Sequence, residues 1–326
     1  MVIVSPALAA ANNGNWQTAR RWRTLLASAH RVRIASSWPD AAASDADAVL
    51  LALHARRSAA SVQAWVQSRG SSRLAVVLTG TDLYEDLLGN EQARRSAHAA
   101  ACLVVLQDEA PAALPPDLRA RARVIYQSTT ARRSLAKGRR TLRAVVVGHL
   151  RDVKSPQTVF DAARLLPEAA GIRIDHYGHA EGDWEHGARE TMATCPHYRW
   201  HGGVPHVLAR RAIQRAHLLV HPSRVEGGAH VVMEAACSGT PVLASDAPGN
   251  VGMLGRGYAG YFPVGDAPAL ARLLLQCRAE QQAPVDPSQG LLARLQAQCE
   301  ARRPLFAPEA ERAALLALVR ELMDAP

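Results

Sequence analysis

The stretch that decides the fold is His221-Pro-Ser-Arg-Val-Glu-Gly-Gly-Ala-His-Val-Val-Met-Glu-Ala (221–235), followed by Ser-Gly-Thr-Pro-Val-Leu-Ala-Ser (238–245). The apolar run Leu218–His221 predicts a strand, the paired glycines predict a turn, and residues 229–238 predict a helix. Gly239 fits the position that ends this helix, because glycine accepts the left-handed conformation common there. A strand, a glycine turn and a helix in this order are typical of one β-α-β unit of a parallel sheet.

The turn in this stretch suits an anionic ligand. Gly227 and Gly228 let backbone N–H groups approach a ligand closely, and the start of the following helix adds a partial positive charge. Glu226 and Glu234 are eight residues apart, one in the loop and one in the helix, so they would meet different parts of one extended ligand. An isolated pair with this spacing would be a loop acid and a solvated helix acid, but the surrounding glycines and Pro222 favour a site.

A second turn has the same design. In Val145-Val-Val-Gly-His-Leu-Arg-Asp-Val-Lys-Ser-Pro, a strand leads through Gly148 to basic residues just ahead of a helix. Ser155 can be the N-cap of that helix and the following proline its first residue. Arg151 and Lys154 could neutralise a diphosphate there without a metal ion. The alternative is that they are two solvated surface cations.

Two turns in the first half are candidates for an acceptor site. Asn12-Asn-Gly-Asn-Trp follows the first predicted strand and places Gly14 before a helix with Asn15 as its N-cap and arginines, among them Arg20, on it. Leu78-Thr-Gly-Thr-Asp-Leu-Tyr ends another strand, where Thr81 or Asp82 could meet a sugar hydroxyl or an acceptor. Asp82 could equally be the cap of a following helix.

Short apolar runs alternate with helical patterns along all 326 residues, which indicates an α/β protein with two Rossmann-like domains of parallel strands. Ligands bind such sheets at the carboxyl ends of the strands, so the expected site is a cleft across which the two sheets face one another. We place the domain boundary in the basic stretch Thr129–Arg143. The predicted strands are Val2–Val4, Val32–Ala35, Ala48–Leu51, Leu74–Leu78, Leu103–Leu106, Val124–Ile125, Ala144–Val147, Ile172–Tyr177, Leu218–His221 and Val242–Ala244. The predicted helices include Trp16–Ala27, Pro156–Leu166, His206–Arg215, Ala267–Glu280 and Glu309–Met323, and Ala283–Gly290 predicts a loop.

Composition excludes several classes of protein. No apolar run is long enough to span a membrane, the first residues lack a basic signal-peptide region, and the five cysteines are odd in number without C-x-x-C spacing, so we expect a reduced cytoplasmic protein. The net charge of +9 is compatible with small anionic substrates, and no aromatic-interleaved basic stripe favours nucleic acid. Gly255-Arg-Gly-Tyr-Ala-Gly260 fits the dinucleotide fingerprint, but no strand precedes it. The histidines lack metal-ligand spacing.

These residues resemble the GT-B glycosyltransferases of the E-x7-E group, family 4. The resemblance implies a nucleotide-sugar donor and neither an essential metal nor another cofactor. It also implies an acceptor domain over residues 1–138, a donor domain over 139–303 and a helix over 304–326 that packs back towards the first domain. By this resemblance Lys154 binds the diphosphate, Glu226 meets the sugar and Glu234 the ribose. Two departures from the family pattern are His149, where an arginine is usual, and the absence of an aromatic residue after Gly227.

The finer resemblance is to the selenosugar synthases of selenoneine biosynthesis. Asn-Gly-Asn-Trp-Gln-Thr-Ala-Arg-Arg-Trp (13–22), Thr-Gly-Thr-Asp-Leu-Tyr (79–84) and His-Leu-Arg-Asp-Val-Lys-Ser-Pro (149–156) carry it. It implies transfer of a sugar from a UDP-sugar, typically UDP-N-acetylglucosamine, to selenophosphate, with release of UDP. Selenophosphate is an anion with a polarisable nucleophile, so no general base is required. The alternatives are a glycosyltransferase acting on a hydroxyl of a lipid or polysaccharide and, more remotely, a nucleic-acid-binding protein.

The expected site residues follow from these motifs and resemblances. We expect a catalytic role for Lys154, Glu226 and Asp82. The expected donor-binding residues are Gly148, His149, Arg151, Lys154, Gly203, Val204, Ser223, Arg224, Glu226, Gly227, Gly228, Ala229 and Glu234, of which Gly203 and Val204 would receive the base. The expected acceptor-binding residues are Gly14, Asn15, Arg20, Thr79, Thr81 and Asp82.

Overall fold

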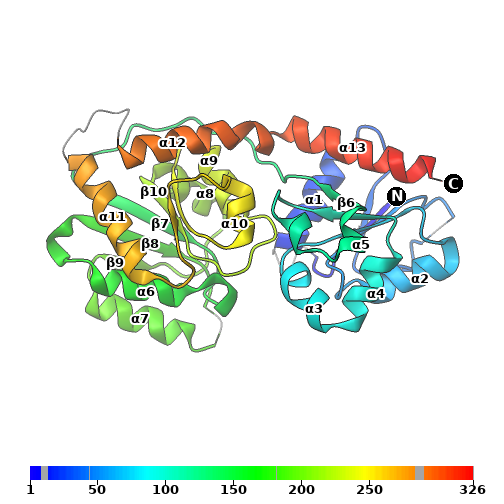
Figure 1. Ribbon diagram of the computed structural model, residues 1–326, viewed down its shortest axis with the longest axis horizontal. Coiled ribbons are helices and arrows are strands. Elements are labelled where there is room, and N and C mark those ends of the chain that lie inside the picture. Colours follow the sequence, from blue (N-terminus) through cyan, green and yellow to red (C-terminus); the bar gives the residue numbers. More distant parts are fainter. Residues whose placement is uncertain (9–13, 44, 181, 283–289, 326) are drawn as a thin grey trace. The chain divides into compact units, whose positions relative to one another are not determined.

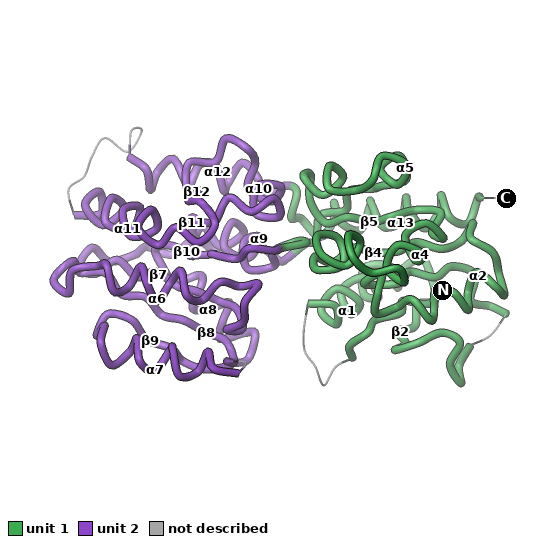
Figure 2. The backbone as a smooth tube through the Cα atoms, turned by 60° about the horizontal axis from the view of Figure 1, so that its bottom comes forward, with its two compact units in different colours: residues 1–128, 226–228, 305–326 green, residues 129–225, 229–304 purple. Residues whose placement is uncertain are grey.

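The protein was analysed as a computed structural model that describes residues 1–8, 14–43, 45–180, 182–282 and 290–325. The chain divides into two compact units (Figure 2). Unit 1 contains residues 1–128, 226–228 and 305–326, and unit 2 contains residues 129–225 and 229–304. Asn12 and Asn13 of the first acceptor turn, and residues 283–289 of the predicted loop, lie outside the described residues.

Unit 1 is built on a parallel sheet with the strand order β2-β1-β3-β4-β5-β6. Figure 1 labels its edge strand β6 and its helices α1 to α5 and α13. Its strands are β1 (Val2–Val4), β2 (Arg33–Ala35), β3 (Leu50–Leu53), β4 (Leu74–Val77), β5 (Cys102–Val105) and β6 (Ala122–Val124). Its helices are α1 (Gly14–Leu26), α2 (Ala59–Arg69), α3 (Leu87–Gly89), α4 (Glu91–Ala99), α5 (Pro116–Arg119) and α13 (Pro308–Asp324), with a π-helical turn at Asp82–Asp86.

Both faces of this sheet are covered, as a parallel sheet requires. On one face Trp38 and Trp65 pack edge to face, with ring centroids 4.8 Å apart. On the other face α1 and α13 pack side by side, and Trp22 and Leu26 of α1 share a core cluster with Leu318 of α13. In α1 the side chains of Ala19, Trp22 and Leu26 are fully buried, while Trp16 is half-buried.

Unit 2 has a second parallel sheet, in the order β12-β11-β10-β7-β8-β9. Its strands are β7 (Leu142–Val147), β8 (Ile172–Tyr177), β9 (Tyr198–Trp200), β10 (Leu218–His221), β11 (Val242–Ser245) and β12 (Tyr261–Phe262). Its helices are α6 (Pro156–Leu165), α7 (Trp184–Thr194), α8 (His206–Arg215), α9 (His230–Ala236), α10 (Pro248–Leu254), α11 (Ala267–Gln282) and α12 (Leu291–Arg302). The predicted α/β class with two Rossmann-like sheets is confirmed.

The sequence analysis did not predict several short or polar elements. Strand β9 has only three residues, and α7 buries only Ala188 and Thr191, so neither carries a clear apolar pattern. The glycine-rich stretch Gly255–Gly260 follows helix α10 rather than a strand, which agrees with its rejection as a dinucleotide fingerprint. No helix in the described residues is both long and apolar enough to cross a membrane.

Each sheet has one place where the strand order reverses. In unit 1 the chain adds β2 on one side of β1 and β3 on the other. In unit 2 it adds β8 on one side of β7 and later places β10 on the other side. The connecting loops leave in opposite directions at such points, which opens a crevice at the carboxyl ends of the two strands. The crevice between β7 and β10 is therefore the first place to look for a ligand site.

A buried carboxylate joins the last helix of unit 1 to the first. Glu311 of α13 is 1% exposed and accepts hydrogen bonds from Arg21 Nε at 2.8 Å, Trp22 Nε1 at 2.7 Å and the backbone N–H of Ser128 at 2.8 Å. The Ser128 hydroxyl donates to the same carboxylate. A buried charge with this many donors is stabilising only while the set is complete.

We expect Glu311→Ala to lower the free energy of unfolding by about 3 kcal/mol, because it leaves the Trp22 and Ser128 donors buried without an acceptor. Chemical denaturation monitored by tryptophan fluorescence measures the change. The matched control is Glu309→Ala, which removes an exposed acid from the same helix and should change stability by less than about 0.5 kcal/mol. Equal effects of the two substitutions would contradict this account of the network.

Candidate functional site

A crevice lies where the strand order of unit 2 reverses. Strands β7 and β10 pair in parallel through Leu218 with Ala144 and Leu219 with Val145, so their carboxyl ends lie side by side. The crevice between the loops that follow is narrow, with a cavity volume of about 10 Å³. Its lining residues are Val146, Val147, Gly148, His149, Lys154, Pro156, His176, His221, Pro222 and Ser223. Four of the predicted donor residues (Gly148, His149, Lys154 and Ser223) thus line one crevice.

The loop after β7 carries the predicted basic residues. A short 3-10 turn over Asp152–Lys154 precedes α6, and the lysine side chain is half-buried, with its aliphatic part near Gly148. A Cβ added to Gly148 would lie 3.9 Å from Lys154 Cδ, so the lysine stem passes over the glycine turn. Arg151 is exposed at the rim of this loop. The lysine is held at the crevice, whereas nothing fixes the arginine there.

The start of helix α6 differs in one detail from the prediction. Pro156 is the first helical residue, as expected, and Ser155 occupies the N-cap position. However, Ser155 has a left-handed backbone with a φ of 48°, and its hydroxyl contacts Thr158 Oγ1 at 2.8 Å instead of capping a backbone N–H. The N–H of Thr158, which an N-cap side chain could accept from, instead donates to the Ser155 carbonyl at 3.2 Å. The predicted N-cap position of Ser155 is therefore confirmed, although its side chain makes no capping hydrogen bond.

The Ser223 hydroxyl is a buried polar group that needs a partner. Ser223 follows β10, is 1% exposed and lines the crevice. Its Oγ has no hydrogen-bond partner among the described residues, although its carbonyl accepts a bond from the Ser245 hydroxyl. An unsatisfied buried hydroxyl costs about 1–3 kcal/mol, and native structures rarely tolerate one without a reason. A ligand oxygen in the crevice would supply the missing partner.

Two histidines close the side of the crevice away from β10. His149 and His179 stack, with ring centroids 5.6 Å apart, and the His179 N–H donates to His149 Nδ1 at 3.1 Å. The Nδ1 atom of His149 therefore carries no proton. A Cβ on Gly203 would lie 2.0 Å from His179 Nε2, so the loop after β9 meets the same pair. The structure thus brings the predicted residues His149 and Gly203 to one edge of the sheet, with the half-buried Val204 next in the chain.

His176 forms the floor of the crevice as a neutral side chain. It lies on β8, is 2% exposed, and its Nδ1 is 3.0 Å from the Tyr198 hydroxyl. Burial lowers the pKa of His176 to about 3, despite an opposing hydrogen bond with the Gly148 backbone. The floor is therefore uncharged at neutral pH, so the positive charge at the crevice comes from its rim.

We expect His176 to make the stability of the protein depend on pH. Between its unfolded pKa of 6.5 and its folded pKa of about 3, the unfolded chain binds a proton that the folded chain does not. The free energy of unfolding should therefore fall, by a few kcal/mol in total, as the pH is lowered through this window. Denaturation curves at several pH values test this. His176→Gln, which cannot titrate, should show a shallower fall, and identical pH profiles would contradict the assignment.

Glu234 is paired rather than solvated. It lies on α9 and is 4% exposed, and its Oε1 is 2.6 Å from His206 Nε2 and 3.7 Å from Arg210 Nε. Burial lowers the pKa of Arg210, although the Glu234 charge opposes that shift. His206 is exposed at the start of α8. A ligand that reaches Glu234 would therefore meet an acid held in place by a histidine.

The segment Glu226–Gly228 belongs to unit 1 by its contacts. A Cβ on Gly227 would lie 2.2 Å from the Thr79 carbonyl oxygen, and one on Gly228 would lie 2.8 Å from Leu106 Cβ. Both positions therefore have to be glycine because the neighbouring chain comes too close for a side chain. Glu226 is 8% exposed, and Ala229, at the start of α9, is 3% exposed. Of the remaining predicted donor residues, Arg224 is exposed, and its N–H donates to Val153 O at 2.9 Å.

Asp82 is fully buried and shapes the turn on which Gly227 packs. Its Oδ1 accepts hydrogen bonds from the N–H groups of Thr79 and Gly80 at 2.8 and 2.9 Å, and its Oδ2 accepts one from Ala55 N at 2.9 Å. The carboxylate is thus used by the backbone in this structure and is not presented to a ligand. The prediction that the Asp82 carboxylate contacts an acceptor is therefore corrected: Asp82 holds the turn together. Thr79 and Thr81, which are half-buried, are the residues of this turn that solvent still reaches.

His54, which the sequence analysis missed, lies beside the same turn. It follows β3 with a φ of 71°, is 2% exposed, and its Nε2 is 3.3 Å from Thr81 Oγ1. Its Nδ1 is 3.8 Å from Asp82 Oδ2, and burial lowers the pKa of His54 in spite of the nearby Asp82 charge. A left-handed backbone at a bulky residue is strained and is common at functional sites. The signal was a histidine at the end of an apolar run, but the predicted strand ended at Leu51.

The first acceptor turn is described only from Gly14 onwards. Helix α1 already includes Gly14, so Asn15 lies inside the helix and not at its N-cap position, and the predicted cap is wrong. Gly14 and Arg20 are exposed, and none of these three residues contacts the Thr79–Asp82 turn in the described interactions. Further along α1, Thr18 Oγ1 accepts a hydrogen bond from Gln127 Nε2 at 2.5 Å.

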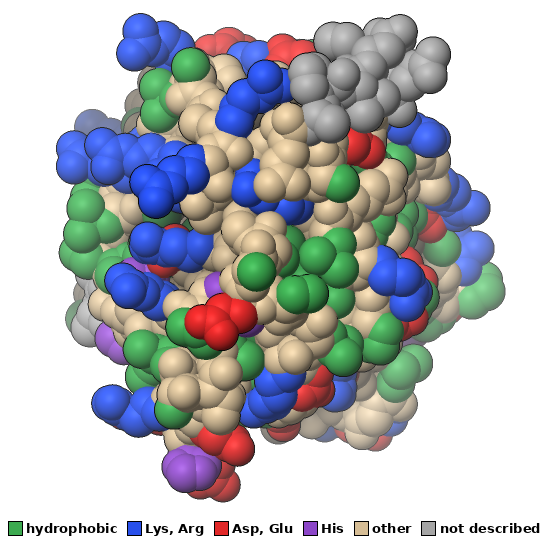
Figure 3. Space-filling view, turned by 90° about the vertical axis from the view of Figure 1, so that its left-hand side faces the viewer, with side chains coloured by type: hydrophobic (Ala, Val, Ile, Leu, Met, Phe, Trp, Pro, Cys, Tyr) green, Lys and Arg blue, Asp and Glu red, His purple; other side chains and the backbone are tan. Residues whose placement is uncertain are grey.

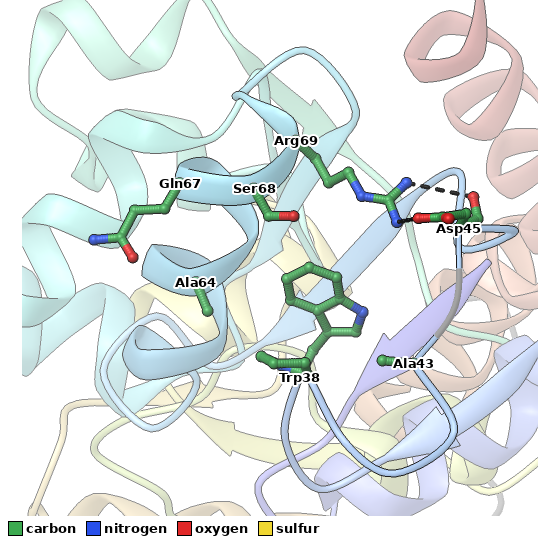
Figure 4. Close-up of a pocket in the computed structure, with 8 residues that line it drawn as sticks. Trp38, Ala43, Asp45, Ala64, Gln67, Ser68 and Arg69 are labelled. Carbon is green, nitrogen blue, oxygen red and sulfur yellow. Dashed lines mark hydrogen bonds and ion pairs between the residues drawn. The ribbon is translucent and has the colours of Figure 1, made fainter.

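A wider hollow in unit 1 is not the candidate site. It contains about 900 Å³ of open space between α2 and the loop after β2, and none of the predicted site residues lines it (Figure 4). Its charged groups already pair with each other, since Arg69 donates to the side chain and carbonyl of Asp45 at 3.1 and 3.3 Å. Trp38, which forms its floor, packs against the core. The hollow therefore lacks the polar groups that fix a ligand.

We expect Gly227→Ala to disturb unit 1, because the added Cβ would force the Thr79 carbonyl to move. Overpacking against backbone costs about 1–3 kcal/mol, so the melting temperature should drop by several degrees. The matched control is Gly257→Ala, since a Cβ there would meet nothing within 4 Å. Differential scanning calorimetry of both variants measures the effect, and an unchanged melting temperature for Gly227→Ala would show that this contact does not matter.

Comparison with known proteins identifies the family of the chain. Residues 127–289, half of the chain, match the model of the family Glycosyl transferases group 1. A comparison with curated protein sequences gives no match.

Solved structures of similar fold cover most of the chain at low sequence identity. Sucrose-phosphate synthase from Thermosynechococcus elongatus superposes with a TM-score of 0.76 at 17% identity, with 98% of each chain covered. HepE from Anabaena in complex with UDP gives a TM-score of 0.74 at 14% identity, again over 98% of each chain. TarM from S. aureus gives a TM-score of 0.64 at 12% identity and covers 85% of this chain, which spans only 55% of the TarM chain. These likenesses show that the fold is GT-B.

Proposed function

Because the chain belongs to the glycosyl transferases group 1 family, we propose that it is a glycosyltransferase that uses a UDP-sugar as donor. The observation that supports this proposal is the crevice between β7 and β10. Lys154, the Ser223 hydroxyl without a hydrogen-bond partner and the neutral His176 all line it. Proteins of the same fold have been solved with such ligands, for example HepE with UDP-glucose and pneumococcal GtfA with UDP and GlcNAc.

In this proposal the crevice binds the diphosphate. The Lys154 ammonium stabilises the negative charge that develops on the departing diphosphate, and the Ser223 hydroxyl donates a hydrogen bond to a phosphate oxygen. Arg151, from the exposed rim, adds to the positive field. The neutral His176 adds no charge at physiological pH, so the positive field at the crevice comes from Lys154 and Arg151.

In this proposal the ribose, the sugar and the base of the donor contact residues beyond the crevice. Glu234, held by His206, accepts hydrogen bonds from the ribose hydroxyls. Glu226 and the backbone of Gly227 and Gly228 meet the sugar, and Gly203 and Val204 receive the base. A carboxylate with a fixed orientation suits two neighbouring ribose hydroxyls, because both donate hydrogen bonds and neither carries charge.

For the acceptor we propose selenophosphate, on the basis of the three selenosugar-synthase-like stretches described above. Selenium attacks the anomeric carbon, the C1–Se bond forms as the C1–O bond to the diphosphate breaks, and UDP leaves with the bonding electrons. The acceptor is already an anion, so no proton has to be removed. Gly14, Asn15, Arg20, Thr79 and Thr81 of unit 1 are the proposed acceptor residues, and Asp82 holds the last two in position.

A hydroxyl acceptor is the second candidate, and one observation favours it. His54 presents a neutral imidazole 3.3 Å from the Thr81 hydroxyl, beside two carboxylates, Asp82 and Asp86. Such an arrangement can take a proton from an attacking alcohol. The two candidates therefore differ in whether catalysis depends on His54.

We expect Lys154→Met to weaken UDP binding by about 10- to 100-fold, because a charge-assisted contact to phosphate is lost. Ser223→Ala should weaken it by about tenfold or more, since a hydrogen bond from an uncharged hydroxyl to a charged phosphate oxygen is lost. Isothermal titration with UDP measures both. Arg164→Met, which removes an ion-paired surface cation from α6, is the matched control and should leave the affinity unchanged. UDP affinity that is insensitive to Lys154 would overturn the diphosphate assignment.

The acceptor is tested by incubating the protein with UDP-N-acetylglucosamine and either selenophosphate or a panel of alcohols, and by measuring UDP release. We expect release with selenophosphate, with a rate that His54→Gln changes by less than about threefold. Release with alcohols only, and its loss by about 100-fold or more in His54→Gln, would replace selenophosphate by a hydroxyl acceptor that needs a base.

A further inference from the structure

The positive charge of this protein is concentrated in two segments. Residues 118–151 contain ten Lys and Arg residues and no Asp or Glu, and residues 191–225 contain five and none. The rest of the chain holds the other 23 of 38 cations together with all 29 acids, a net charge of −6. The overall +9 therefore comes entirely from these two acid-free segments.

The two segments meet in unit 2, where the stretch before β7 runs beside α8. The Gln214 side chain donates to Arg133 O at 2.7 Å, and the Arg143 guanidinium donates to Arg215 O at 2.7 Å. The Arg143 N–H also donates to His217 Nδ1 at 3.0 Å. Arg139 and Arg140 are fixed through their carbonyl oxygens, which accept bonds from Arg278 of α11 at 2.8 Å each.

This packing forms a surface that we call the arginine patch. Its members are Arg133, Arg139, Arg140, Arg143, Arg211 and Arg215. All are exposed except Arg143, which is half-buried. Across the described part of the chain none of the six forms an ion pair with a carboxylate. Figure 3 shows Lys and Arg side chains gathered towards the upper left of the face that it views.

The arginine patch lies at the opposite edge of the sheet from the crevice. Arg139 and Arg140 precede β7, and Arg143 lies near its first residue, whereas Gly148 and Lys154 follow its last residue. Arg215 likewise ends α8 just before β10 begins, whereas Ser223 follows the carboxyl end of that strand. The six cations therefore cannot contact a diphosphate bound in the crevice, and the substrate does not account for them.

Helix α8 adds apolar side chains to this surface. Four of its exposed residues lie on one side of the helix: Val207 and Leu208 near its start, beside the exposed His206, then Arg211, and Arg215 at its end. Val207 and Leu208 are 50% and 44% exposed. Exposed aliphatic residues in line with arginines are typical of helices that lie on a lipid surface, where the guanidinium groups bind phosphates and the aliphatic groups enter the acyl boundary.

We propose that the arginine patch and the exposed face of α8 dock the protein peripherally onto an anionic phospholipid surface. Guanidinium groups bind phosphate in a bidentate manner, and none of the six patch arginines is paired with a carboxylate of the described residues, so their charge is available to a negative bilayer. Nucleic acid is a poorer match, because no aromatic residue is among the large hydrophobic side chains exposed in the described residues, so the surface lacks a stacking platform for bases.

Vesicle co-sedimentation at low and physiological salt tests this proposal. We expect binding to vesicles of phosphatidylcholine with one-third phosphatidylglycerol, no binding to phosphatidylcholine alone, and weaker binding as salt rises. Arg211→Glu/Arg215→Glu should weaken partition by about tenfold or more, since each cation near the surface contributes about fivefold. Val207→Ser/Leu208→Ser should weaken it at high salt, where the apolar contribution dominates.

The matched control is Arg94→Glu/Arg95→Glu on α4, which changes the net charge by the same amount at arginines that lie beside Glu91. It should lose less than about threefold in partition. Circular dichroism and thermal unfolding establish that each variant is folded. Equal binding to both kinds of vesicle, or equal losses in the α8 variant and the α4 control, would overturn the proposal. Salt-sensitive binding of duplex RNA that the α8 variant abolishes, without vesicle binding, would assign the surface to nucleic acid instead.

Discussion

The parallel pairing of β10 with β7 is the interaction on which the candidate site depends. It brings together two turns that are about 70 residues apart in the chain, one ending in Lys154 and one containing Ser223. Each turn by itself is a glycine- or proline-containing loop with a polar side chain. Because the strands are neighbours and their connections leave in opposite directions, the turns instead become two walls of one crevice with His176 as its floor.

In unit 1 a buried carboxylate has the corresponding role. Asp82 accepts three backbone hydrogen bonds and thereby fixes the turn at Thr79 and Gly80. Gly227 then packs on that turn at a distance that excludes any side chain. There are thus two reasons for glycine at positions 227 and 228. Glycine suits a ligand-facing turn, and it lets the segment Glu226–Gly228 approach a neighbouring backbone. Asp82 acts through these contacts and not by touching a ligand.

Charge is divided between two surfaces of unit 2. At the carboxyl edge of the sheet a single half-buried lysine stands over an uncharged floor, which suits a small anion of defined shape. Towards the amino edge lie six mostly exposed arginines from two segments without Asp or Glu, an arrangement that suits an extended anion without a defined shape. Both arise from the same two segments, because β7 and β10 begin at one edge and end at the other. A single composition value such as the net charge of +9 conceals this division.

The sequence by itself determined the α/β class, ten of the twelve strands found in the described residues to within two residues, and the glycine turns, and it predicted the candidate donor residues. These follow from local patterns, since apolar runs, glycines and helix caps report the conformation of their own neighbourhood. It did not determine that Asp82 is buried, that Glu234 pairs with His206, that Asn15 lies inside α1, or that His54 stands beside Thr81. Only the tertiary structure decided these points, because strand order sets which distant residues become neighbours, and burial then sets whether a polar side chain faces a ligand or the backbone.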